Sequence, residues 1–494
     1  MYDPILCGLA ANPELPAELV DLLIANADDV LAAELAERER LSSAQISALA
    51  DRDQQSAVRL VQRGLLAVDR IDPITQPVAA LAALEQGVER PEWARLLMTA
   101  PAPEHREQLA ACPDLPPDVV DHLADDPDIS VVIELALWTP DPSVTAGLAG
   151  HAHADVRAGV AANEHTPPAV LAALLTGDEA EAATRCLVCD EDPRAMPWPD
   201  ACTGAHEAAV HTMYERALRN PATPVGLLAR FADHPSFILR DALATREDLP
   251  QAVYERLARS PEPGVRAALA ANPAISADLM RVLACDADLA VRRGLAVNPH
   301  IPLDLLTTLA ETPKIGPAVL PAIAAASPEQ VEVLARSTAA TVRMLIAARD
   351  DLPAGIRDLL AADPDAKVLK SIATHSGLSA AQLSAMVDRH GPRVAVRLAR
   401  NPETPPALLE RISRLRPPVP KALREIAKQP QAGVPALVAC LADPRARPVA
   451  AGHPALPPEM IVALLDDDQP GVVENAAANP SLPVPVMIDL VRSR

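Results

Sequence analysis

The sequence predicts an all-α protein, an α-solenoid of stacked two-helix repeats about 26 residues long. One observation is a recurring phrase, Asn-Pro-x-x-Pro, in which Ser replaces the last Pro at position 276. Another is that the 52 prolines recur in register with this phrase, while the period-two alternation typical of strands is missing. The phrase's Asn, or the residue in its place (the Asn position), falls at Asn12, Arg38, Gly64, Gln86, Cys112, Trp138, Asn163, Asn220, Arg246, Asn272, Asn298, Ala324, Arg349, His375, Asn401, Ala427, His453 and Asn479.

The first element of each repeat is a short helix that precedes the Asn position. In residues 265–271 the large apolar residues Val265 and Leu269 are four positions apart, which places them on one helical face. The Asn-Pro pair that follows ends this helix, because proline lacks the amide donor and disfavours helical backbone in the residue before it.

The second element is a longer helix that begins at the next Pro, as in residues 302–310. Proline is tolerated at the first helical position, since that amide has no intrahelical acceptor. We expect the Thr before such a proline to be an N-cap, at Thr166, Thr223 and Thr404. Where the proline is missing, Ser42 with Gln45 and Ser379 with Gln382 have the spacing of a capping box. Neither helix can bury its apolar face alone, so successive repeats must stack.

Residues 265–286 and 291–310 come closest to the consensus Val-Arg-x-x-Leu-Ala-x-Asn-Pro-x-Leu-Pro-x-x-Leu-Leu-x-x-Leu-Ala-x-Asp. This pattern covers most of the chain and resembles the leucine-rich repeat variant (LRV) family. The resemblance implies a right-handed superhelix in which α-helices alternate with short, 3₁₀-like helices, here in about nineteen repeats. Some family members carry an iron–sulfur domain with clustered N-terminal cysteines, but here only Cys7 precedes Cys112.

The repeat register divides one continuous solenoid into three stretches. Residues 1–185 form acidic repeats, residues 186–215 form an irregular repeat that contains cysteines, and residues 216–494 form regular repeats. The irregular repeat lies in the long interval between Asn163 and Asn220.

The formal net charge of −22 is unevenly distributed. Residues 1–200 carry −23, residues 201–494 carry +1, and residues 381–430 within the latter carry +6. A solvated surface explains this charge; the alternative is a platform for a basic partner in residues 1–200, or end-to-end self-association. No signal peptide or long apolar run is seen, so we expect a cytoplasmic protein without a membrane partner. The richness in Ala, Arg and Pro fits a GC-rich bacterial genome.

The irregular repeat contains Cys186-Leu-Val-Cys189, followed by Cys202 and His206. Three thiolates and one imidazole can hold Zn²⁺ tetrahedrally, and clustered cysteines can also hold an iron–sulfur cluster. The alternative, which the sequence favours, is packed thiols, because Cys189 and Cys202 stand where neighbouring repeats place core Ala and Leu. On that interpretation the protein has no cofactor.

Two groups of basic residues are candidate binding sites. An Arg six residues before the Asn position recurs at Arg240, Arg266, Arg292 and Arg343, where a row of guanidinium groups could hold anions or could link adjoining turns. The basic zone comprises Arg411, Arg414, Arg416, Lys421 and Arg424. It lacks aromatic residues for base stacking and the rest of the chain is acidic, which disfavours nucleic acid.

The sequence shows no phosphate-binding glycine loop and no nucleophile motif, so we do not expect an enzyme. The function favoured is a non-catalytic scaffold that binds a protein or peptide along the solenoid surface. The alternatives are a metal-binding, redox-responsive repeat protein and a nucleic-acid-associated scaffold.

Overall fold

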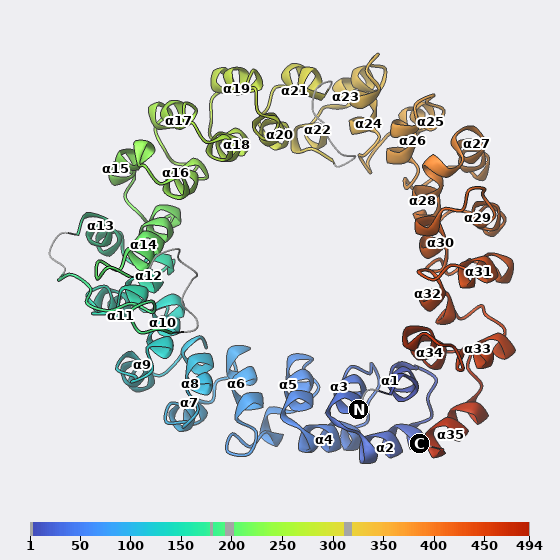
Figure 1. The fold of residues 1–494 in the computed structure, drawn as a ribbon, viewed down its shortest axis with the longest axis horizontal. Coiled ribbons are helices and arrows are strands. Elements are labelled where there is room, and N and C mark those ends of the chain that lie inside the picture. The colour runs from blue at the N-terminus through green and yellow to red at the C-terminus, as the bar shows by residue number, and fades with distance from the viewer. Residues whose placement is uncertain (1–2, 178–180, 193–201, 311–318, 494) are drawn as a thin grey trace. The chain divides into compact units, whose positions relative to one another are not determined.

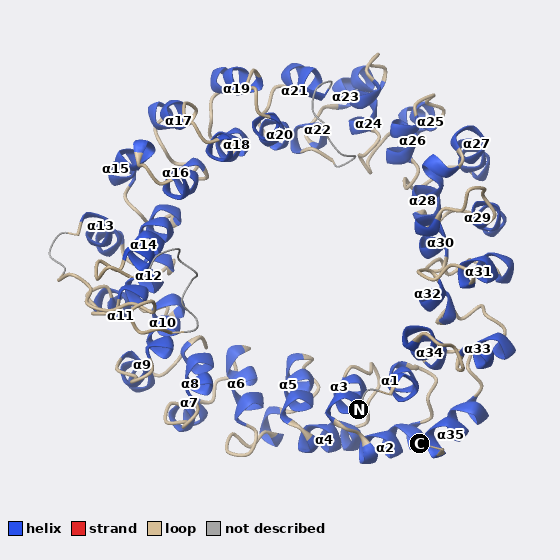
Figure 2. Ribbon diagram, in the orientation of Figure 1, coloured by secondary structure: helices blue, strands red, loops and turns tan. Residues whose placement is uncertain are grey.

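The computed structural model describes residues 3–177, 181–192, 202–310 and 319–493. Within these ranges the chain is helical throughout, and its one β interaction is an isolated bridge between His153 and Arg185 (Figures 1 and 2). The predicted all-α solenoid is therefore confirmed: each Asn position has one pair of helices, the first before it and the second after it. None of the described helices is long and apolar enough to cross a membrane.

The chain forms two compact units, which we call the central unit (residues 67–309) and the terminal unit (residues 1–66 together with 310–494).

In the central unit, the first helices of the repeats are α6 (Pro77–Glu85), α8 (Pro103–Ala110), α10 (Ile129–Trp138), α12 (Ala154–Ala162), α14 (Glu207–Arg219), α16 (Phe237–Ala244), α18 (Pro263–Ala271) and α20 (Leu289–Val297). The second helices are η1 (Val68–Arg70), α7 (Pro91–Leu97), α9 (Pro117–Ala124), α11 (Pro142–Leu148), α13 (Pro168–Thr176), α15 (Val225–Leu228) continued by η2 (Ala229–Asp233), α17 (Gln251–Leu257), α19 (Ala277–Ala284) and, at the boundary of the unit, α21 (Leu303–Ala310).

In the terminal unit, the first helices are α1 (Pro4–Ala11), α3 (Asp29–Ala36), α5 (Gln54–Gln62), α22 (Pro321–Ala324), α24 (Ala340–Ile346), α26 (Ala366–Ile372), α28 (Pro392–Arg400), α30 (Pro420–Ile426), α32 (Arg447–Ala451) and α34 (Pro470–Ala477). The second helices are α2 (Ala17–Asn26), α4 (Ser43–Arg52), α23 (Pro328–Ala335), α25 (Ala354–Ala361), α27 (Ala380–His390), α29 (Pro406–Ser413), α31 (Val434–Leu441), α33 (Pro458–Leu464) and α35 (Val484–Arg492).

Most short helices keep α geometry, and among the described residues 3₁₀ geometry occurs in η1 and η2. The alternation of α and 3₁₀-like helices implied by the resemblance is therefore limited to these two repeats. Proline at the first helical turn, as at Pro263 of α18, starts a helix without costing a hydrogen bond, and extended backbone at Asn272 ends it. Helices such as α18 are short because they are bounded on both sides in this way.

The capping boxes predicted at Ser42 and Ser379 are both present. The Thr prediction was wrong: Thr223 Oγ1 donates backwards to the carbonyl of Ala217 (2.5 Å), and Thr404 Oγ1 donates to the carbonyl of Leu398 (2.6 Å). Thr166 makes the same bond to Val160. The last carbonyls of the first helix lack intrahelical donors, so the hydroxyl satisfies one of them instead of capping the second helix.

Where the Asn position holds asparagine, its side chain is buried and links successive repeats. Asn298 Nδ2 donates to the carbonyls of Ala270 (2.9 Å) and Asn272 (2.7 Å) in the preceding repeat, and its Oδ1 accepts from the amide of His300 (2.9 Å). At Arg246 and Arg38, which replace Asn, the guanidinium reaches the equivalent carbonyls: Arg246 donates to Leu218 and Asn220, and Arg38 to Ala10 and Asn12. The asparagine, or the arginine at Arg38 and Arg246, therefore joins its repeat to the one before it.

The same link joins the first repeat to the last within the terminal unit. Helix α1 packs against α34, and Asn12 Nδ2 donates to the carbonyls of Ala477 (2.9 Å) and Asn479 (2.7 Å). The residues that form this contact are more than 460 positions apart in sequence.

Candidate metal centre

The irregular segment follows α13, which ends at Gly177 in a left-handed conformation, φ 71°. Its described residues, 181–192 and 202–206, contain no helix, and α14 begins immediately afterwards. The described residues of the irregular repeat predicted at 186–215 are therefore a loop followed by the start of α14, and α14 is the first helix of the repeat at Asn220.

The four residues singled out in this segment come together. One ligand atom from each of Cys186, Cys189, Cys202 and His206 lies within 4.8 Å of all the others. His206 Nδ1 is 3.5 Å from Cys189 Sγ and 3.6 Å from Cys202 Sγ. In a tetrahedral zinc site, with Zn–S of about 2.3 Å and Zn–N of about 2.0–2.1 Å, neighbouring ligand atoms are about 3.5–3.8 Å apart. The two nitrogen–sulfur separations match this geometry, and the remaining ligand atoms, all within 4.8 Å of one another, are close enough to contract onto a single ion.

Backbone amides orient two of the sulfur atoms. The amide of Cys189 donates to Cys186 Sγ (3.4 Å), and the amide of Gly204 donates to Cys202 Sγ (3.4 Å). Gly204 has φ 94°, a conformation that favours glycine. Such N–H···S bonds stabilise a thiolate, and the bond from Gly204 lowers the pKa of Cys202. A cation at the centre of the cluster favours deprotonated sulfurs in the same way.

The three thiols interact electrostatically because their sulfur atoms lie close together. The hydrogen bond with Cys202 is the largest cause that raises the pKa of Cys189 to about 12, and Cys186 adds to the effect. Three thiolates cannot share so small a volume unless a positive charge lies between them. The arrangement is therefore chemically suited to a divalent ion with sulfur affinity.

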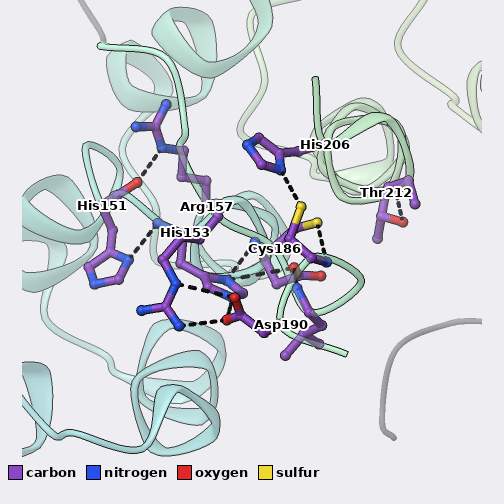
Figure 3. Close-up of polar contacts among 12 residues, drawn as sticks. His151, His153, Arg157, Cys186, Asp190, His206 and Thr212 are labelled. Atoms are coloured by element: carbon purple, nitrogen blue, oxygen red, sulfur yellow. Dashed lines mark hydrogen bonds and ion pairs between the residues drawn. The ribbon is translucent and has the colours of Figure 1, made fainter. Parts of the chain in front are cut away.

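His206 is buried and directly precedes α14 in a left-handed conformation, φ 55°, ψ 38°. This backbone conformation is costly for a residue with a Cβ atom, on the order of 1–3 kcal/mol, and such strain is concentrated at functional sites. The conformation directs the imidazole toward the sulfur atoms (Figure 3). It also places the cluster at the positive end of the α14 dipole, which favours thiolates.

The Cys186 loop is anchored on the start of α12. The amide of Leu187 donates to Asp155 Oδ2 (2.9 Å), and the amide of Ala154 donates to the carbonyl of Arg185 (2.9 Å). Asp190 forms an ion pair with Arg185 at 3.0 Å. His153 Nε2 lies 3.4 Å from the carboxylate of Asp190, and burial lowers the pKa of His153 (Figure 3). The loop is thereby fixed to a regular repeat on one side, while His206 directly precedes the next helix, α14, on the other.

Apolar residues pack around Cys186, the buried cysteine of the cluster. Cys186 packs in a buried group with Ala154 and Ala209, and Val188 packs against this group. Cys189, in contrast, is exposed. The sequence-based alternative of packed core thiols describes Cys186 well, but an exposed cysteine beside two other thiols and a histidine is not a core residue.

The Arg residues that recur six positions before the Asn position link neighbouring turns. Arg266 forms a bidentate pair with Asp286 (2.7 and 3.1 Å), and Arg343 forms the same pair with Asp363 (2.7 and 3.1 Å). Arg240 pairs with Glu262, and Arg292 donates to the carbonyls of Asp286 and Ala287. These guanidinium groups are engaged inside the protein, as the structural interpretation of the row requires.

The basic zone is partly neutralised by its own acidic neighbours. Arg411 pairs with Asp388 (2.8 Å) and Arg414 with Glu410 (2.6 Å). Arg416 donates to the carbonyl of Leu415, while Lys421 and Arg424 are exposed and have no ion-pair partner among the described residues. The structure does not gather the zone into one site.

Two contributors to the cluster could not have been found from the motif alone. Asp155 lies 32 residues before the amide that it accepts from. Gly204 contributes through its backbone amide. Its position between Cys202 and His206 is the one feature of the sequence that could have pointed to this contribution.

Comparison with known proteins does not identify a family: no family model and no curated protein matches the chain.

Proposed function

We propose that this protein is a non-catalytic binding scaffold of the LRV type, in which a structural zinc ion fixes the irregular repeat. The observation that carries the proposal is the convergence of three sulfur atoms and one imidazole nitrogen within 4.8 Å. Four protein ligands complete a tetrahedral zinc site and leave no open position for a substrate, which is the pattern of structural rather than catalytic zinc. An iron–sulfur cluster is less well supported, because several metal and sulfide atoms between the ligands would hold them further apart.

The role of the ion follows from what its ligands connect. Cys186 and Cys189 belong to the loop anchored on α12, whereas His206 directly precedes α14. Helices α12 and α14 are also packed against each other as successive first helices. The ion therefore stabilises stacking at the point where the repeat register is interrupted, as metal binding does in other small loop-rich segments.

Zinc content tests this proposal directly. Protein purified without chelators is expected to contain about one zinc per chain, measured by inductively coupled plasma mass spectrometry. Cys189→Ser should lose it, whereas the matched control Cys285→Ser, which alters another exposed cysteine outside the cluster, should retain it. Equal and negligible zinc in all three proteins would contradict the proposal.

The exposure of Cys189 supports a second candidate function, a redox response. An oxidant that reaches this sulfur converts it from a thiolate ligand into a disulfide or sulfenic acid, and the ion is then released. Stoichiometric peroxide should release zinc into a chromogenic chelator, and thiol reductant should allow rebinding. Peroxide that oxidises Cys285 but leaves zinc bound would exclude this function.

The partner of the scaffold is proposed to be a protein or peptide, with a basic character toward residues 1–200, which carry a charge of −23. Electrostatic attraction predicts binding that weakens as salt rises. Affinity capture from the native cell at a series of salt concentrations tests this. A partner whose recovery is independent of salt would show that charge does not drive the binding.

A further inference from the structure

The first repeat of the chain docks on the last by the same contacts that join internal repeats. In the internal pair α18 and α20, a Cβ at Gly294 would lie 2.4 Å from the carbonyl oxygen of Ala267. In the terminal pair α34 and α1, a Cβ at Gly8 would lie 2.2 Å from the carbonyl oxygen of Glu474. Gly8 and Gly294 each stand four residues before their Asn position, and Glu474 and Ala267 each stand five before theirs.

The hydrogen bonds at this contact repeat the internal pattern as well. Asn12 reaches two carbonyls of the last repeat at 2.9 and 2.7 Å, the same distances by which Asn298 reaches its two carbonyls. Asn12 is fully buried, and Cys7 and Leu9 on the same helix are buried too. The terminal repeats of a solenoid normally have polar outer faces, whereas here α1 has an apolar outer face that α34 covers.

Helix α35 extends this acceptor surface. It contacts both α1 and α2, so each helix of the first repeat has a counterpart in the last two helices of the chain. The contact is therefore a complete repeat-to-repeat interface.

We propose that the face formed by α34 and α35 is a self-recognition surface for the first repeat of this protein, which the first repeat of a second copy can occupy in place of the chain's own. Nothing in the contact requires both partners to belong to one chain, because all its bonds are formed between repeats. The intramolecular partner has the higher effective concentration, so the unmodified protein is closed and monomeric. Opening the contact frees one donor repeat and one acceptor face, and two copies then join head to tail.

Two full-length variants separate the donor from the acceptor. Gly8→Gln adds a side chain where Glu474 and Ala477 leave no space, and it blocks the donor while α34 is unchanged. Ala477→Gln blocks the acceptor, because Ala477 Cβ lies 2.7 Å from the Cβ position of Gly8, and leaves the donor unchanged. Each variant alone is expected to stay monomeric, whereas an equimolar mixture should form a one-to-one dimer, measured by light scattering and native mass spectrometry.

Cys7 reports opening within a single chain. Its thiol is buried, and burial, followed by the charges of Glu474 and Glu34, raises its pKa to about 11. Maleimide labelling of Cys7, read by peptide mass spectrometry, should accelerate about tenfold or more in Gly8→Gln, as overpacking opens the contact. Gly264→Gln, a matched control at a helical glycine with nothing within 4 Å, should leave the rate unchanged.

The outcomes decide between self-recognition and an incidental contact. Faster labelling in both blocking variants, with a dimer in the mixture alone, supports the proposal. The proposal is overturned if Cys7 in the blocking variants is labelled at the rate of the unmodified protein. It is also overturned if the mixture stays monomeric although each variant is open and retains its helical circular dichroism. Gly294→Gln disturbs an internal interface and should leave the labelling rate of Cys7 unchanged. Faster labelling of Cys7 in this variant would also overturn the proposal, because it would show that general destabilisation of the solenoid is sufficient to expose Cys7.

Discussion

Replacing a single buried asparagine of the repeat should weaken the solenoid by several kilocalories per mole. Asn298→Ala removes two hydrogen bonds to the carbonyls of Ala270 and Asn272 and one from the amide of His300. The side chain is fully buried, so water cannot replace the lost partners without entering the interface. The two carbonyls belong to the preceding repeat, and the change therefore acts on stacking rather than on one helix.

The magnitude follows from the three bonds. Each contributes about 0.5–1.5 kcal/mol net, and a buried group left without a partner costs about 1–3 kcal/mol. We expect Asn298→Ala to lower the free energy of unfolding by about 3 kcal/mol. Asn298→Asp should cost more at neutral pH, because its carboxylate would face two carbonyl oxygens and could not donate. Burial should raise the folded-state pKa of that Asp above its usual value, so the variant's stability should fall as pH rises from about 4 to 7.

Urea unfolding followed by circular dichroism at 222 nm measures the loss, and hydrogen exchange shows where it acts. Exchange should accelerate first in α18 and α20, which the asparagine joins, because repeat proteins open through neighbouring interfaces. Asn26→Ala is the matched control: its side chain is exposed and bonds only to Leu22 within α2. Asn298→Ala as stable as Asn26→Ala, within about 0.5 kcal/mol, would refute the reasoning.

Three further outcomes are expected. Arg266 lowers the pKa of Asp286, so the pair stabilises the fold above about pH 4, and this contribution is lost as the pH falls further. Arg266→Leu should therefore lower the free energy of unfolding at pH 7 by about 1–3 kcal/mol. Urea titrations at several pH values should also show a smaller loss of stability below about pH 4 than in the unmodified protein. Gly294→Ala should cost about 1–3 kcal/mol in the same assay, whereas Gly264→Ala should be neutral or slightly stabilising, and equal effects would contradict the packing argument. Chelation should lower the thermal midpoint and speed proteolysis within residues 181–192 and 202–206, to the level seen in Cys189→Ser without chelator. An unchanged digest would argue against a structural ion.

The fold was predictable because its rules are local. The Pro at many helix starts and the Asn-Pro that follows the first helix in six repeats act within a few residues, and both are visible in the sequence. The Thr residues misled because a hydroxyl can satisfy either the carbonyl behind it or the amide ahead of it, and only the path of the chain decides. The docking of α1 on α34 was also beyond prediction, because a repeat period does not state where the two ends of the chain lie.

The candidate metal centre was half visible in the sequence. The motif supplied all four ligands but could not separate a metal site from packed thiols, because Cys186 is buried in either case. The deciding information is three-dimensional: the direction in which His206 points, the amide of Gly204, and the anchoring of Leu187 on Asp155. These depend on backbone conformation and on contacts far apart in sequence.

X-ray absorption at the zinc K-edge tests the central claim most directly, because it reports the atoms bound to the metal. The protein purified without chelators should give about three sulfur neighbours at about 2.3 Å and one nitrogen at about 2.0–2.1 Å. The spectrum of Cys285→Ser should be the same, since that residue lies outside the cluster. A shell of oxygen and nitrogen alone, or a purified protein without zinc, would contradict the account.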